Sequence, residues 1–114
     1  MVMTPKTVTI DCADPRRLAG FWTEAAGYKV VNDFDMFVLL APEAGEGINI
    51  GLQKVPEDRI GKNRVHIDWH SGDRNAEVER LAKLGATVLS EQSMPGLTWT
   101  VLADPDGNEF CVAG

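Results

Sequence analysis

Hydrophobic and polar positions alternate strictly in the segment 64–70, RVHIDWH. Its apolar residues, at positions 65, 67 and 69, point to one side of an extended chain, and His66, Asp68 and His70 point to the other. A period of two residues is typical of a β-strand with two unlike faces. The segment is therefore predicted to be a strand whose polar face carries two imidazoles and a carboxylate, groups that bind metals and transfer protons.

The segment 6–28 repeats the layout of the segment 64–86. Each begins with an alternating strand, reaches an aspartate suited to cap a helix, continues for about three helical turns and ends at a glycine suited to a left-handed cap. These residues are Asp14 and Asp73, 59 positions apart, and Gly27 and Gly85, 58 positions apart. Further on, EGINI resembles DGNEF at an offset of 60. These matching features occur in the same order in both segments and at one near-constant offset, which indicates an internal duplication.

Each half is predicted to contain a strand, a helix and three further strands, which makes the fold class α+β. The expected strands lie near 6–12, 28–32, 35–41 and 47–54, and then near 64–70, 86–91, 97–103 and 108–113. The expected helices lie near 14–26 and 73–84. Each helix has an apolar stripe that would face a sheet, formed by Leu18, Phe21, Trp22 and Ala25, and by Val78, Leu81, Ala82 and Leu84.

The polar segment 55–63 joins the two halves and is too short to separate independent domains. We therefore expect one domain over 1–114, with a first module at about 5–55 and a second at about 64–114.

Charge and cysteine content exclude several classes of protein. The net charge is −6 over 114 residues, and an acidic chain without a basic run is a poor partner for nucleic acids or anionic membranes. No apolar stretch approaches the roughly 20 residues that span a bilayer, and the N-terminus lacks a signal-peptide pattern. Cys12 and Cys111 lie in strand-like runs with opposite faces, which disfavours a disulfide and indicates a reducing, cytoplasmic setting.

The helix after each first strand needs an apolar sheet face to pack on. The apolar sides of these strands therefore go under the helices, where each large side chain contributes roughly 1.5–3 kcal/mol by burial. The polar sides must then face the opposite surface of the sheet. The last strand alternates in the same way, so we expect His66 and Glu109 to lie on the same face of the sheet, away from the helix.

The plan of two β-α-β-β-β copies resembles the vicinal oxygen chelate superfamily, which includes glyoxalases, extradiol dioxygenases and bleomycin-resistance-type binding proteins. The resemblance covers essentially the whole chain, and its most specific pieces are GKNRVHID (61–68) and LADPDGNEF (102–110). It implies the glyoxalase/bleomycin resistance/dihydroxybiphenyl dioxygenase fold. In that fold two curled mixed sheets surround a cleft, and helices cover their convex faces.

Metal-binding members of this superfamily take one ligand from the first and last strand of each half. The resemblance places His66 at the third ligand position and Glu109 at the fourth, where a divalent Zn, Ni, Co, Mn or Fe ion would suit them. The first half departs from the pattern, because Thr7 stands opposite His66 in the duplication, and Asn49 or Gln53 stands opposite Glu109. The expectation is one divalent metal, held by His66, Glu109 and Gln53, or no metal.

Further roles follow from the same resemblance and from the alternation. Glu109 is the expected proton-transferring residue, and the cleft-facing residues assigned to substrate binding are Thr7, Thr9, Asp68 and Cys111. Structural roles stay open beside these. His66 could simply bond Glu109 or a backbone carbonyl, His70 could be exposed or cap the next helix, and Trp99 is expected to pack between sheet and helix.

Two functions from different classes fit these residues. As an enzyme, the protein would be a metal-assisted lyase, isomerase or dioxygenase acting on a small oxygenated substrate. As a binding module of the bleomycin-resistance type, it would hold a small molecule without a metal and without turnover. The long edges of two four-stranded sheets also favour a homodimer.

Overall fold

The computed structural model describes residues 3–114, which fall into two compact units divided between Asp58 and Arg59. Each unit contains a strand, a helix and three strands, so the predicted duplication of a β-α-β-β-β plan is confirmed. That the two units together form a single domain stays a prediction. Each unit is described by itself below.

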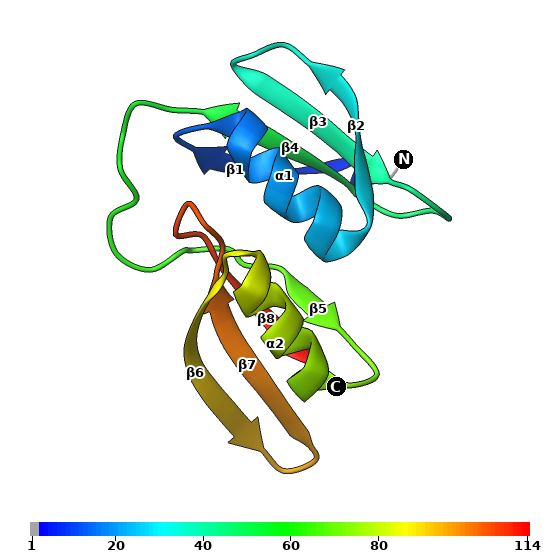
Figure 1. Cartoon of the computed structure of the whole chain (residues 1–114), viewed down its shortest axis with the longest axis vertical. Helices are drawn as coiled ribbons and strands as arrows, with labels where there is room; N and C mark the ends of the chain where they lie inside the picture. The colour runs from blue at the N-terminus through cyan, green and yellow to red at the C-terminus, as the bar shows by residue number, and fades with distance from the viewer. Residues whose placement is uncertain (1–2) are drawn as a thin grey trace. The chain divides into compact units, whose positions relative to one another are not determined.

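The elements follow the expected order in both units (Figure 1). The first unit comprises β1 (Thr7–Cys12), α1 (Pro15–Ala26), β2 (Tyr28–Asp33), β3 (Phe37–Pro42) and β4 (Asn49–Lys54). The second comprises β5 (Asp68–His70), α2 (Arg74–Leu84), β6 (Thr87–Met94), β7 (Leu97–Ala103) and β8 (Glu109–Ala113).

The two sheets have the same topology. Their strand orders are β1-β4-β3-β2 and β5-β8-β7-β6, so in each unit the first and last strands are neighbours. This first pairing is parallel, and the other two pairings in each sheet are antiparallel. The mixed sheets implied by the family resemblance are therefore confirmed. The parallel pairing brings the first strand of each unit beside the last, although they are far apart in sequence.

The helix boundaries follow from their capping residues. The Asp14 carboxylate accepts a hydrogen bond from the backbone N–H of Arg17, and the Asp73 carboxylate accepts one from the N–H of Ala76. These contacts satisfy N–H groups that have no partner inside the helix. At the other end of α1, Gly27 has a φ of 68°, in the left-handed region that glycine enters without steric cost. Both N-caps predicted from the sequence are confirmed.

One face of each sheet packs on its helix (Figure 1). In the first unit Leu18 and Trp22 of α1 are buried together with the sheet residues Leu40, Ile50 and Leu52. In the second unit the buried apolar side chains are Leu81 of α2 and, on β7 and β8, Leu102, Phe110 and Val112. The opposite face of each sheet is left without a helix of its own unit.

The strand expected at 64–70 is shorter than predicted, because only Asp68–His70 form β5. The chain before it is partly held by other bonds: the Ile67 carbonyl accepts from the N–H of Cys111, and the Asn63 side chain donates to the Glu109 carbonyl at 3.2 Å. The Asn63 side chain thus bonds to the Glu109 carbonyl of β8, with which a longer β5 could have paired. Val65, expected under the helix, is 79% exposed because it lies in this irregular segment.

One position of the predicted helix stripes is also wrong. Ala82 is exposed, whereas Leu81 is buried and Val78 and Leu84 are half-buried. The second stripe is therefore narrower than the sequence suggested. Among residues 3–114, no helix is both long and apolar enough to cross a membrane.

Candidate functional site

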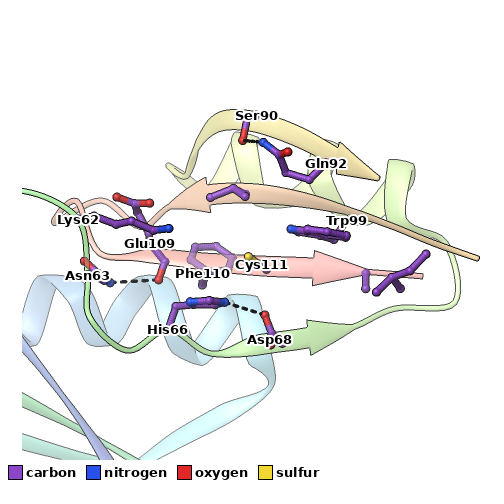
Figure 2. Close-up of a pocket in the computed structure, with 13 residues that line it drawn as sticks. Lys62, Asn63, His66, Asp68, Ser90, Gln92, Trp99, Glu109, Phe110 and Cys111 are labelled. Carbon is purple, nitrogen blue, oxygen red and sulfur yellow. Dashed lines mark hydrogen bonds and ion pairs between the residues drawn. The ribbon is translucent and has the colours of Figure 1, made fainter. Parts of the chain in front are cut away.

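A cavity of about 730 Å³ opens on one face of the sheet of the second unit (Figure 2). Its lining comes from all four strands of that sheet and from the segment before β5: Lys62, Asn63, His66, Asp68, Ser90, Gln92, Leu97, Trp99, Val101, Glu109, Phe110, Cys111 and Ala113. The volume falls within the range of about 300–1,000 Å³ that is common for small-molecule pockets. A ligand of drug-like size would therefore fit.

The strand alternation places this cavity on the face opposite α2. Thr100 is buried against α2, where its hydroxyl accepts a hydrogen bond of 2.7 Å from Arg74 Nη1. Its neighbours on β7, Trp99 and Val101, must point to the other face, and both line the cavity. The polar face of the segment around His66 therefore lies on the cavity side.

Three possible metal ligands meet at the β5–β8 edge of the cavity. One imidazole nitrogen of His66, one carboxylate oxygen of Asp68 and the sulfur of Cys111 all lie within 4.8 Å of one another. Within this group, His66 Nε2 and Asp68 Oδ1 are 3.1 Å apart. Figure 2 shows the imidazole and the carboxylate turned toward each other on the β5 side, with the sulfur on the neighbouring strand.

The Cys111 thiol sits in an environment that disfavours its negative form. Burial raises its pKa above the usual value, the charge of Asp68 and a hydrogen bond with Asp68 raise it further, and Glu109 adds to the effect. Only Lys62 opposes these influences. A cysteine, histidine and aspartate together can also form a nucleophilic triad, but that chemistry requires a thiolate with a lowered pKa. The electrostatics here therefore disfavour a nucleophilic role for Cys111.

Glu109 lies on the same cavity as His66, but its carboxylate is engaged elsewhere. Glu109 Oε2 lies 3.4 Å from Arg59 Nη1, and in Figure 2 the carboxylate points away from the His66 imidazole, toward the side on which Lys62 lies. The side chain of Glu109 is 19% exposed, which strengthens its attraction to the cation relative to a fully solvated pair. Glu109 therefore helps to hold the segment 59–63 beside the start of β8.

Trp99 forms part of the apolar wall of the cavity, together with Leu97 and Val101. The expectation that Trp99 packs between sheet and helix is wrong. Its face is decided by pairing with β8: Trp99 lies opposite Ala113, and Ala113 lines the cavity, as does Cys111 two residues earlier. The cavity therefore combines an indole on the β7 side with imidazole and carboxylate groups on the β5 side.

The remaining predicted site residues belong to the first unit. Thr7 and Thr9 are exposed on β1, on the side away from the buried Cys12. The Gln53 amide nitrogen on β4 donates to the backbone carbonyls of Met36 and Lys54, each at 3.3 Å. Their part in a ligand or metal site stays a prediction.

Comparison with known proteins agrees with this topology. A family described as a glyoxalase-like domain matches residues 7–113. The chain belongs to the glyoxalase-like domain family, within the vicinal oxygen chelate superfamily. No curated protein matches the sequence.

Solved structures share the glyoxalase-like fold at low sequence identity. A protein from Agrobacterium tumefaciens, solved in solution by NMR, has a TM-score of 0.82 and 16% identity, with 99% of this chain and 98% of that one covered. A glyoxalase/bleomycin resistance/dioxygenase family enzyme from Burkholderia phytofirmans has a TM-score of 0.79 and 17% identity, with 95% of each chain covered. A superfamily member from Sphaerobacter thermophilus has a TM-score of 0.75 and 22% identity, with 98% and 97% covered. Identities this low show the fold alone.

The metal positions expected from the resemblance, His66, Glu109 and Gln53, stay a prediction. His66 is available, but Glu109 is paired with Arg59. In the first unit, Thr7 offers a poor ligand, and the amide nitrogen of Gln53 is bonded to backbone carbonyls, so its amide oxygen is the atom that would bind an ion. The side chains that do gather around His66 are those of Asp68 and Cys111, which the sequence assigned to substrate binding.

Several cavity residues were not singled out from the sequence. Ser90 and Gln92 of β6 are bonded to each other at 3.1 Å, and Lys62 and Asn63 precede β5. The alternation of β6 could have placed Ser90 and Gln92 on one face, but nothing in it identifies which face. Lys62 and Asn63 lie in an irregular segment, where no periodic signal exists.

Proposed function

We propose that this glyoxalase-like protein binds a small, planar, oxygenated molecule in the cavity of the second unit. The observation that carries the proposal is the division of that cavity into an apolar wall around Trp99 and a polar edge formed by His66 and Asp68. An aromatic ligand would lie against the indole, and its oxygen atoms would reach the imidazole. Lys62 supplies a positive charge for a ligand carboxylate.

The simplest test is a thermal-shift screen of small phenols, catechols and hydroxybenzoates, followed by calorimetric titration of any compound that raises the melting temperature. Replacing Trp99 by leucine should weaken binding about 3–10-fold, because an aromatic pair contributes roughly 0.5–1.5 kcal/mol beyond the area that it buries. A control is Trp22→Phe, because Trp22 is buried under the first sheet and does not line the cavity. Equal binding by the wild type and Trp99→Leu would contradict the proposal.

A second candidate function is metal-assisted chemistry on the same molecule, of the lyase, isomerase or dioxygenase kind. Its support is the set of ligand side chains at the polar edge of the cavity. Turnover of a compound found in the screen, dependent on added divalent metal, would separate an enzyme from a binding module. Binding without turnover, unchanged by a chelator, would favour the binding module.

We also propose that the protein lies in a reducing compartment such as the cytoplasm, where both cysteines stay free. Within that compartment we propose that it forms a homodimer. The outer strands β2 and β6 carry exposed apolar side chains, namely Val30, Val31, Val88 and Leu89, each between 42% and 49% exposed. Covering such edges removes apolar surface from water. Light scattering during gel filtration should give twice the mass of one chain. A mass of one chain at micromolar concentration would refute the dimer.

A further inference from the structure

We propose that His66, Asp68 and Cys111 form a binding site for a single zinc-type divalent ion, which shares His66 with the ligand positions implied by the family resemblance but uses Asp68 and Cys111 in place of Glu109 and Gln53. An imidazole, a carboxylate and a thiolate are three ligand types that zinc takes in proteins. All three side chains line the same cavity, and their ligand atoms lie within 4.8 Å of one another. The inference is independent of the aromatic ligand, and it deepens the second candidate function by naming the side chains that would hold the ion.

Only small movements would close this site around an ion. Zinc bonds of about 2.0–2.3 Å in a tetrahedron set the ligand atoms roughly 3.3–3.8 Å apart. The His66–Asp68 separation is already 3.1 Å, and the widest separation in the group is at most 4.8 Å. The side chains of His66 and Asp68 are 42% and 74% exposed, so side-chain rotation can supply the remaining change of about one ångström.

The sheet itself brings the three ligands together. Asp68 on β5 and Cys111 on β8 are direct partners in the parallel pairing of these strands. Side chains of paired residues point to the same face, which here is the cavity face. His66 lies two residues before Asp68, and its side chain reaches the same side. Two of the three ligands therefore stand on a paired strand framework and not on loops.

The duplicated first unit provides an internal comparison. Its β1–β4 pairing matches Thr9 with Gly51, as the β5–β8 pairing matches Asp68 with Cys111. Thr7 takes the place of His66. The first unit therefore has no strong ligand at any of the three positions, although its backbone follows the same plan. The ligand set is a property of the second unit and not a consequence of the fold.

The charge around Cys111 suits a cation. The carboxylates of Asp68 and Glu109 line the same cavity as Cys111, and Lys62 is the one lysine or arginine in that lining. When the ion binds, the S–H bond breaks, the S–metal bond forms, and the proton leaves to the buffer.

Three protein ligands leave a fourth position of a tetrahedral zinc ion for a water molecule or a substrate oxygen, as in catalytic zinc sites. That position would open into the cavity of about 730 Å³ that Trp99 also lines. A closed structural site would instead use a fourth side chain. The arrangement is therefore the kind that polarises a bound oxygen atom.

The test uses the full chain, freed of metal with a chelator and titrated with Co²⁺ as a spectroscopic substitute for zinc. We expect one Co²⁺ per chain and a thiolate-to-cobalt charge-transfer band in the near ultraviolet. Cys111→Ser should lose the band, and Asp68→Asn should bind Co²⁺ more weakly. Because Asp68 is 74% exposed, its replacement should leave the melting temperature of the metal-free protein unchanged.

Two matched controls decide between sites. Cys12→Ser, which removes the other free cysteine, should keep the band, because Cys12 lies in the first unit. Glu109→Gln should also keep the band and the stoichiometry. If Glu109→Gln loses the metal while Asp68→Asn keeps it, the family position holds the ion and the proposal is overturned. Absence of a thiolate band in the folded wild type would overturn it as well. Failure of the aromatic-ligand screen leaves these results unaffected, so the two proposals fail separately.

Discussion

The turn between β7 and β8 should depend strongly on Asp104, a carboxylate that is only 2% exposed. Asp104 Oδ1 accepts hydrogen bonds from the backbone N–H groups of Asp106 and Asn108, both at 2.9 Å. The Asp104 carbonyl accepts a third bond, from the N–H of Gly107. This turn leads directly into Glu109 and so sets where the cavity side of β8 begins.

Replacing Asp104 by alanine removes both carboxylate bonds and leaves two partly buried N–H groups to find water. Each hydrogen bond to a charged group contributes roughly 1.5–3 kcal/mol, and partial access of water to the amides reduces the loss. We expect the free energy of unfolding to fall by about 2–4 kcal/mol. For a chain of this size, 1 kcal/mol corresponds to about 4 °C, so the melting temperature should fall by roughly 8–16 °C.

The matched variant is Asp104→Asn, which keeps one oxygen acceptor at the same place and replaces the other oxygen, together with the charge, by an NH2 group. Its expected loss is about 1 kcal/mol, and far-ultraviolet circular dichroism during heating measures both variants. A loss of the same size for alanine and asparagine would refute the reasoning, because the acceptor would then not matter. So would a loss below about 0.5 kcal/mol for alanine, which is ordinary for a surface position.

Other expected outcomes concern the first unit. Tyr28→Phe should lower the free energy of unfolding by about 1 kcal/mol, because the hydroxyl donates a bond of 2.7 Å to the carbonyl of Ile48. Burial raises the pKa of Tyr28 above the ordinary tyrosine value of about 10. The wild type therefore keeps this stability below about pH 10 and loses it as pH rises through the raised pKa, whereas Tyr28→Phe should lose less in an alkaline melting series. Gly51→Ala should cost about 1–3 kcal/mol, because its Cβ would lie 2.6 Å from Phe37 Cζ, and Phe37→Leu should recover part of the loss in a double-mutant cycle. Gly27→Ala should cost about 1 kcal/mol in the same melting assay, since φ is 68° there, and an unchanged melting temperature would contradict the assigned cap.

Local chemistry in the sequence determined the elements and their faces. Asp14 and Asp73 indicate where the two helices begin, because their side chains can cap free N–H groups within three residues along the chain. Alternation around Asp68 separates a polar face from an apolar one, because successive side chains in a strand point to opposite sides. The duplication is also visible in the sequence alone, because it needs only ordered landmarks at a constant offset.

Which residues meet in the site depends on contacts between segments that are far apart in sequence, and no local pattern predicts those contacts. Alternation indicates on which face of its strand each of Asp68 and Cys111 lies. Only the register of the β5–β8 pairing decides that these two residues lie directly opposite each other. The same long-range pairing turned Trp99 toward the cavity, against the expectation that a large aromatic residue packs under a helix. The direction of the Glu109 side chain was set by Arg59, fifty residues away.

The sequence by itself therefore determined which residue types line the faces of the sheets, because backbone periodicity is a property of neighbouring residues. Only the tertiary structure decided which of those residues meet. Register across a parallel pair is a choice among several pairings, and a shift of two residues along β8 keeps every side chain on its face while exchanging Cys111 for Glu109 beside Asp68. The ligand set of the cavity follows from that choice and not from the alternation.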